Sequence, residues 1–68
     1  MITEIGITAG DIWHYLDKHH TASVDELVTG IKKPKALVLM SLGWLAREGH
    51  VTLGDEQAGY RAKLSSVR

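Results

Sequence analysis

The sequence contains no cysteine, no excess of charge of either sign and no long apolar run. Without cysteine, disulfides and thiolate metal sites are excluded. No apolar stretch approaches the roughly 20 residues that cross a bilayer, and the first six residues lack the basic region of a signal peptide. We therefore expect no membrane segment and a cytoplasmic location.

The chain has 68 residues, of which 44% are hydrophobic. This length is short for a domain, so we expect a single domain over residues 1–68. The apolar content is typical of a folded chain and not of a disordered tail. Chains this short rarely bury enough apolar surface to be stable without an additional stabilising feature, such as disulfides, a bound metal or self-association. Since disulfides are absent, close packing or self-association has to supply the stability.

Apolar spacing predicts a first helix over residues about 3–19. Its start is signalled either by Thr8 followed by Asp11, as a capping pair, or by Thr3, if the helix tolerates two glycines. The apolar positions that share one face are Ile5, Ala9, Ile12, Trp13 and Leu16.

A Ser-x-x-Glu capping box, Ser23 to Glu26, predicts a short second helix over residues about 24–31. The hydroxyl and the carboxylate of such a box each accept a hydrogen bond from a backbone N–H at the helix start. The residues before it, Thr21 and Ala22, are a short connector or one bridge of a strand. We expect Lys32 and Lys33 to form the turn that follows this helix.

A third helix is predicted over residues about 34–48. Pro34 suits its first position, where no N–H is needed, and Gly49 suits its C-terminal cap.

Alternating residues on both sides of a polar loop predict a hairpin over residues about 50–64. This order predicts an α+β, mainly α, winged helix-turn-helix: three helices and a C-terminal β-hairpin wing. A generic α+β mini-domain is the alternative.

The third helix is apolar nearly all round. At about 100° per residue, one stripe holds Val38, Leu42 and Leu45 with Ser41 beside them, and we expect it to face the core. Leu39 lies on a flank. An opposite arc holds four residues, which are candidate interface residues: Leu37, Met40, Gly43 and Trp44. This arc either packs on the N-terminal segment or the wing of the same chain, or is an interface for a second copy or another protein.

The net charge of zero is the sum of the charges of four successive segments, whose signs alternate along the chain. Five acids and one lysine give residues 1–26 a net charge of −4, and four cations without an acid give residues 27–47 a charge of +4. Residues 48–56 carry −3 and residues 57–68 carry +3. Cations at the start of the third helix and on the wing are placed where winged helices contact phosphates. The candidate nucleic-acid-binding residues are Lys32, Lys33, Lys35, Arg47, Arg61 and Lys63.

Base recognition by the third helix is poorly supported. Arg, Lys, Asn and Gln are the side chains that usually contact base edges. Only Lys35 and Arg47 on this helix are of that type. If the chain binds duplex DNA, we therefore expect little sequence preference.

No catalytic or metal-binding set is evident. The histidines, His14, His19, His20 and His50, lack the spacing of a ligand pair. No nucleophile, base and orienting group can be grouped by spacing. We therefore expect no enzymatic activity, no metal, no cofactor and no small-molecule substrate.

Two blocks carry a family resemblance: residues 9–16, AGDIWHYL, and residues 40–48, MSLGWLARE. They resemble a small uncharacterised winged helix-turn-helix family of bacteria and archaea, over about Ile5 to Leu64. The resemblance implies the winged-helix fold and small stand-alone members. It carries over no activity and no functional residue.

Two functions remain open. The first is a DNA-associated transcriptional regulator with weak sequence readout, acting as a homodimer. The second is a protein-interaction or homodimerisation module whose third helix is an apolar interface and which does not bind DNA. A dimer through the third helix would block DNA there. A dimer through Ile2, Ile5, Trp13 and Tyr15 of the first segment would leave that helix free.

Overall fold

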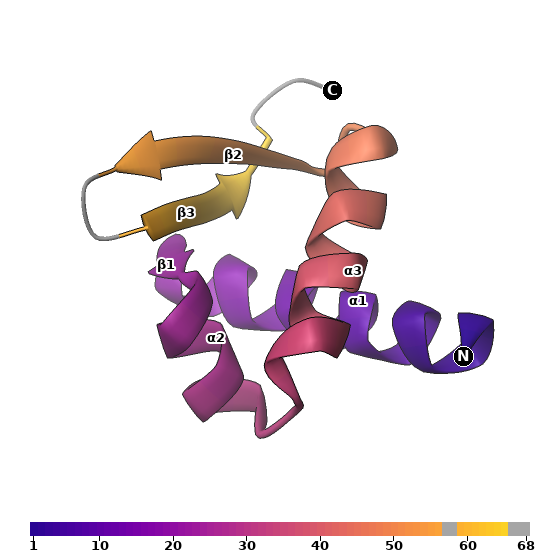
Figure 1. The fold of residues 1–68 in the computed structure, drawn as a ribbon. Coiled ribbons are helices and arrows are strands. Elements are labelled where there is room, and N and C mark those ends of the chain that lie inside the picture. Colours follow the sequence, from indigo (N-terminus) through magenta and orange to yellow (C-terminus); the bar gives the residue numbers. More distant parts are fainter. Residues whose placement is uncertain (57–58, 66–68) are drawn as a thin grey trace.

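A computed structural model describes residues 1–56 and 59–65 and shows helices and strands in the order of a winged helix. The predicted fold class is confirmed: three helices precede a β-hairpin wing, with a short strand between the first two helices (Figure 1). The elements are α1 Ile2–His19, β1 Thr21–Ser23, α2 Val24–Ile31, α3 Lys35–Arg47, β2 Val51–Glu56 and β3 Gly59–Leu64.

At the start of α1, packing between elements outweighs the helix-capping signal at Thr8. The helix begins at Ile2 with Met1 as its N-cap, so the interpretation of Thr8 as a cap is wrong. Thr8 instead lies inside the helix, fully buried, and its Oγ1 has no hydrogen-bond partner in the described part of the chain. Packing of an apolar face over many turns outweighs one capping signal, because tertiary contacts supply most of a helix's stability.

The capping box at the start of α2 is confirmed. The backbone N–H of Glu26 donates to Ser23 Oγ over 3.0 Å, and the backbone N–H of Ser23 donates to Glu26 Oε1 over 2.8 Å. The helix ends at Ile31, and its C-cap Lys32 has a left-handed φ of 58° that turns the chain towards α3.

The ends of α3 follow from one proline and one glycine. Pro34 has an extended ψ of 144° and is the N-cap, so its predicted place as the first helical residue is wrong by one position. Its carbonyl still accepts the first helical hydrogen bond, from Val38. At the other end Gly49 has a φ of 80°, and the N–H groups of Gly49 and His50 donate to Ala46 and Leu45. These two bonds form a Schellman motif, which favours glycine at the left-handed position.

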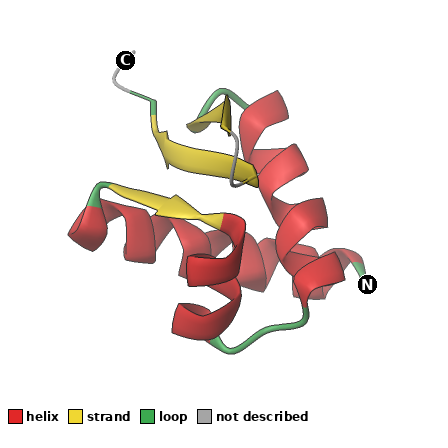
Figure 2. Cartoon of the chain, turned by 60° about the vertical axis from the view of Figure 1, so that its left-hand side comes forward, coloured by secondary structure: helices red, strands yellow, loops and turns green. Residues whose placement is uncertain are grey.

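The three strands form an antiparallel sheet in the order β1-β3-β2. Ala62 of β3 pairs with Ala22 on one side and Leu53 on the other. Residues directly opposite each other share a face of the sheet, so these three define its inner face. The sheet lies beside the C-terminal half of α3 (Figure 2). The strand alternative for Thr21 and Ala22 is therefore the observed one.

The inner stripe of α3 lies at the centre of the core, as predicted. Val38, Leu42 and Leu45 are buried against α1, α2 and the sheet. Ser41 is also buried, and its hydroxyl donates to the carbonyl of Ile5 in α1 over 3.2 Å. The full core comprises Ala9, Ile12, Leu16, Ala22, Val24, Leu27, Val38, Leu42, Leu45, Val51 and Ala62.

Gly30 and Gly10 offer a matched test of this packing. A Cβ built on Gly30 would overlap with Cε2 of Tyr15, whereas one built on Gly10 meets nothing within 4 Å. Gly10→Ala should stabilise the fold by up to about 1 kcal/mol through helix propensity. Gly30→Ala should destabilise it, because overpacking costs about 1–3 kcal/mol and exceeds that gain. Urea unfolding of both variants checks this, and stabilisation by Gly30→Ala would contradict it.

Candidate interaction surface on the third helix

The outer side of α3 exposes large apolar side chains. Leu39, Met40 and Trp44 are 44%, 42% and 48% exposed, and Leu37 is half-buried. Neither the N-terminal segment nor the wing covers them in a single copy. Gly43, in the middle of this side, has open space where a Cβ would lie. We call Leu37, Leu39, Met40, Gly43 and Trp44 the α3 face.

The α3 face continues into an apolar groove beside the wing. The groove has a volume of about 240 Å³, and its walls come from α3, from the start of α2 and from both strands of the hairpin. Leu53 and Tyr60 form its outer wall and are themselves exposed. The lining residues are Val24, Leu39, Leu42, Gly43, Leu53 and Tyr60.

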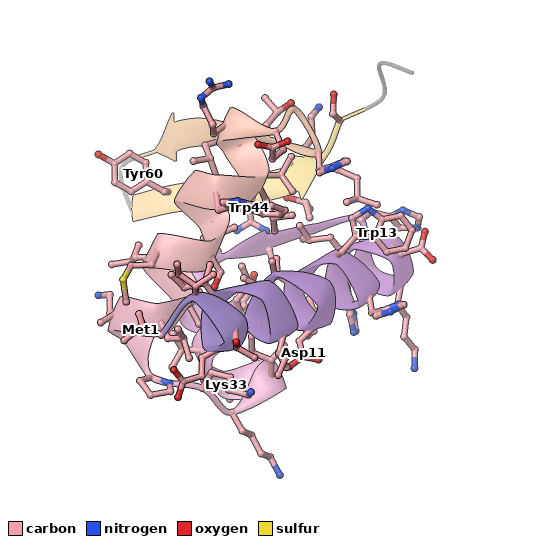
Figure 3. The ribbon with its side chains drawn as sticks, turned by 90° about the vertical axis from the view of Figure 1, so that its right-hand side faces the viewer. Met1, Asp11, Trp13, Lys33, Trp44 and Tyr60 are labelled. Carbon is pink, nitrogen blue, oxygen red and sulfur yellow. The ribbon has the colours of Figure 1, made fainter. Side chains whose placement is uncertain are left out.

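On the other side, the α3 face approaches a flank of α1. Trp13 is 38% exposed, and it lies with Trp44 on the same side of α1 (Figure 3). Ile2 is exposed as well. Tyr15, in contrast, turns towards α2: its ring lies against Gly30 and stacks on His19 with 4.1 Å between ring centroids. Of the residues of the first segment proposed for a dimer, Ile2 and Trp13 are therefore available, and Tyr15 and Ile5 are half-buried.

Three of the predicted cations gather at the turn between α2 and α3. Lys32 and Lys35 are exposed, at the end of α2 and the start of α3. Lys33 is half-buried, and its Nζ lies 3.7 Å from Oδ2 of Asp11 in α1 (Figure 3). An ion pair that water still reaches, like this one, contributes at most about 1 kcal/mol, but a phosphate would have to compete with Asp11 for this lysine.

The wing cations lie elsewhere. Residues alternate between the two faces of a strand, so Arg61 and Lys63 project from the face of β3 opposite to Ala62, away from the core. Nη2 of Arg61 lies 3.5 Å from Oε1 of Glu26, in the first turn of α2. The lysine turn is at the other end of α2. The structure thus separates the wing cations from the lysine turn, and Arg47 lies apart from both, in the last turn of α3.

No feature of the described residues suggests a reaction centre. In that part of the chain, His, Asp and Glu side chains form no group of three that could hold a metal ion. The hollow that contains His14 and His19 is open and lies between α1 and the end of α2. Of the helices described, none combines the length and apolar character that crossing a bilayer requires.

Comparison with known protein families finds one family whose model matches most of the chain. The family model for winged helix-turn-helix domains designated DUF2582 matches residues 1–62. The chain belongs to this family. No curated protein shows significant sequence similarity to the chain.

A solved structure supports the same fold. The chain is similar to protein BT2368 from Bacteroides thetaiotaomicron, solved in solution by NMR, with a TM-score of 0.81 and 26% identity. The match covers 91% of this chain and 76% of that one. This similarity supports the fold of the chain, and no ligand or activity follows from it.

Sequence reasoning missed the wing side of this surface. Leu53 and Tyr60 were predicted only as hairpin residues, and Leu39 as a flank of α3. Their meeting in one groove depends on the register of the hairpin and its distance from α3. Alternation along the strand could have placed Tyr60 and Ala62 on one face of β3, but the place of Leu53 opposite Ala62 follows from the register.

The Glu26 carboxylate gives a pH test of the link between α2 and the wing. The backbone N–H of Ser23 lowers the pKa of Glu26 below its ordinary value of 4.5; burial opposes this shift, and Arg61 adds to it. A lowered pKa means that the charged form stabilises the fold above about pH 4.5 and that this contribution is lost as the pH falls through the folded-state pKa.

Glu26→Gln keeps the oxygen acceptor but removes the charge. Urea midpoints of both proteins should differ at neutral pH and converge in acid; an equal gap at both would contradict this assignment.

Proposed function

We propose that this winged-helix domain acts by binding protein through the α3 face and does not read DNA bases. The observation that carries the proposal is the exposure of Leu39, Met40 and Trp44 on the helix that a DNA-reading winged helix inserts into the major groove. Contiguous exposed apolar side chains of this size are typical of protein interfaces. Trp is also prominent among the residues that dominate interface energies.

The chemistry of base recognition points the same way. A base edge needs donors and acceptors from the protein, and the outer side of α3 between its two ends offers only apolar side chains and glycine. Insertion of Trp44 and Met40 into a groove would also leave polar base edges facing apolar groups without hydrogen bonds. The groove beside the wing extends the apolar surface and can accept a side chain from a partner.

The second candidate is association with duplex DNA through phosphates, from which a role in transcriptional regulation would follow. It is supported by the family's winged-helix fold and by the exposed Lys32 and Lys35 at the start of α3. Such contact would be independent of sequence and would weaken steeply as salt increases, because it rests on counterion release.

A titration with fluorescent duplexes separates the two candidates. We expect no saturable binding at about 0.15 M salt and only weak binding at low salt. The low-salt binding should fall in a Lys32→Ala, Lys35→Ala variant and stay unchanged in Trp44→Gln, because only the lysines would contact phosphates.

The opposite result would reject the proposal. Saturable binding at about 0.15 M salt that prefers one duplex sequence and is lost in Trp44→Gln would show that α3 reads DNA. Circular dichroism of each variant serves as the folding control, and since these three side chains are all exposed, we expect native spectra.

A further inference from the structure

Within the bounds of its own helix, each of the two tryptophans has one charged residue a turn later, and these two charges are opposite; Glu48, four residues after Trp44, is the C-cap beyond the end of α3. Asp17 follows Trp13 by four residues on α1, and Arg47 follows Trp44 by three on α3. Residues three or four apart are neighbours on a helix surface. Each tryptophan therefore forms an apolar and charged pair with its neighbour, and the two pairs are complementary.

Both pairs are exposed in a single copy, where the ring of Trp13 contacts only that of its neighbour His14 among the described aromatic side chains. Trp13 and Trp44 are exposed on the same side of α1 (Figure 3). Asp17 and Arg47 are exposed, and within the described residues neither makes an ion pair. Asp17 borders a hollow with Thr52, Leu64 and Lys63 of the sheet, but no salt bridge to Lys63 forms across it. The other acids of α1 differ, because Glu4 pairs with the N-terminal amine and Asp11 with Lys33.

We infer that the partner of the α3 face is a second copy of this chain, in a two-fold pair that places Trp13 and Asp17 of one copy against Trp44 and Arg47 of the other. The inference rests on the proposed function and names its partner. A two-fold axis repeats every contact, so one arrangement satisfies both tryptophans and both charges of each copy. α1 and α3 pack against each other within the chain, which brings both halves of the contact to one side of the molecule.

The size of the core favours a second copy over an unrelated protein. The core formed by the described residues holds eleven side chains and is small, and a domain with so small a core commonly needs additional stabilisation. A dimer formed by every folded copy supplies that stabilisation by mass action. An unrelated partner would stabilise the chain only when it is present.

Charge reversal with sedimentation equilibrium tests the inference. The wild-type chain should dimerise in the micromolar range. Arg47→Glu and Asp17→Lys should each raise the dissociation constant at least about tenfold, because each places two like-charge contacts in the interface. Mixing the two single variants should restore a heterodimer, in which every contact again joins opposite charges.

The mixture distinguishes contact between copies from contact within one copy. If Asp17 and Arg47 acted on each other inside a chain, the two variants would not rescue each other when mixed. The matched control is Lys18→Glu, which lies next to Asp17 but lines the hollow beside α2. It should dimerise like the wild type. All three variants should keep native circular dichroism, since these positions are exposed.

A wild-type monomer throughout the concentration range would overturn the inference, as would single variants that dimerise normally or a mixture without recovery. These outcomes leave the proposed function to be decided separately by the duplex titration. A monomer that does not bind DNA through α3 would retain that function with a different protein partner. A monomer that binds DNA through α3 would reject both.

Discussion

The packing of the inner side of α3 across α1 is the contact on which the rest of the structure depends. Val38, Leu42 and Leu45 fill the centre of the core, and Ser41 bonds to the backbone of α1. Burying one such aliphatic side chain is worth roughly 1.5–3 kcal/mol, which is a large share of the marginal stability of a small domain. The capping box of α2 and the Schellman motif after α3 then set the ends of the helices that meet there.

That same contact buries one side of α3 and leaves the other side open. The buried side is occupied by α1, α2 and the sheet, and none of the described elements covers Met40 and Trp44. In a DNA-reading winged helix the free side is polar, so its exposure to water is favourable. Here it is apolar, and exposure is unfavourable until something covers it. The apolar composition of α3 is therefore the basis for proposing that this side of the helix binds protein and does not bind DNA.

Local signals in the sequence predicted most of the fold, and contacts between distant segments account for what they missed. The Ser23 and Glu26 box and Gly49 act within one helical turn, so their residues alone specify the local geometry. Thr8 was misread because its burial depends on packing of α1. The two ion pairs that engage Lys33 and Arg61 join residues far apart in sequence, and no spacing rule could reveal them. The α3 face was predictable as an apolar arc, whereas its exposure depended on where the wing lies.

The most direct test of a protein-binding α3 face uses the indole N–H signals of Trp13 and Trp44 in nitrogen-15 NMR. We expect both signals to shift together as the chain is concentrated through the micromolar range, and duplex DNA at about 0.15 M salt to move neither. Signals that are independent of concentration, together with a shift of the Trp44 signal on addition of duplex DNA, would contradict a protein-binding α3 face.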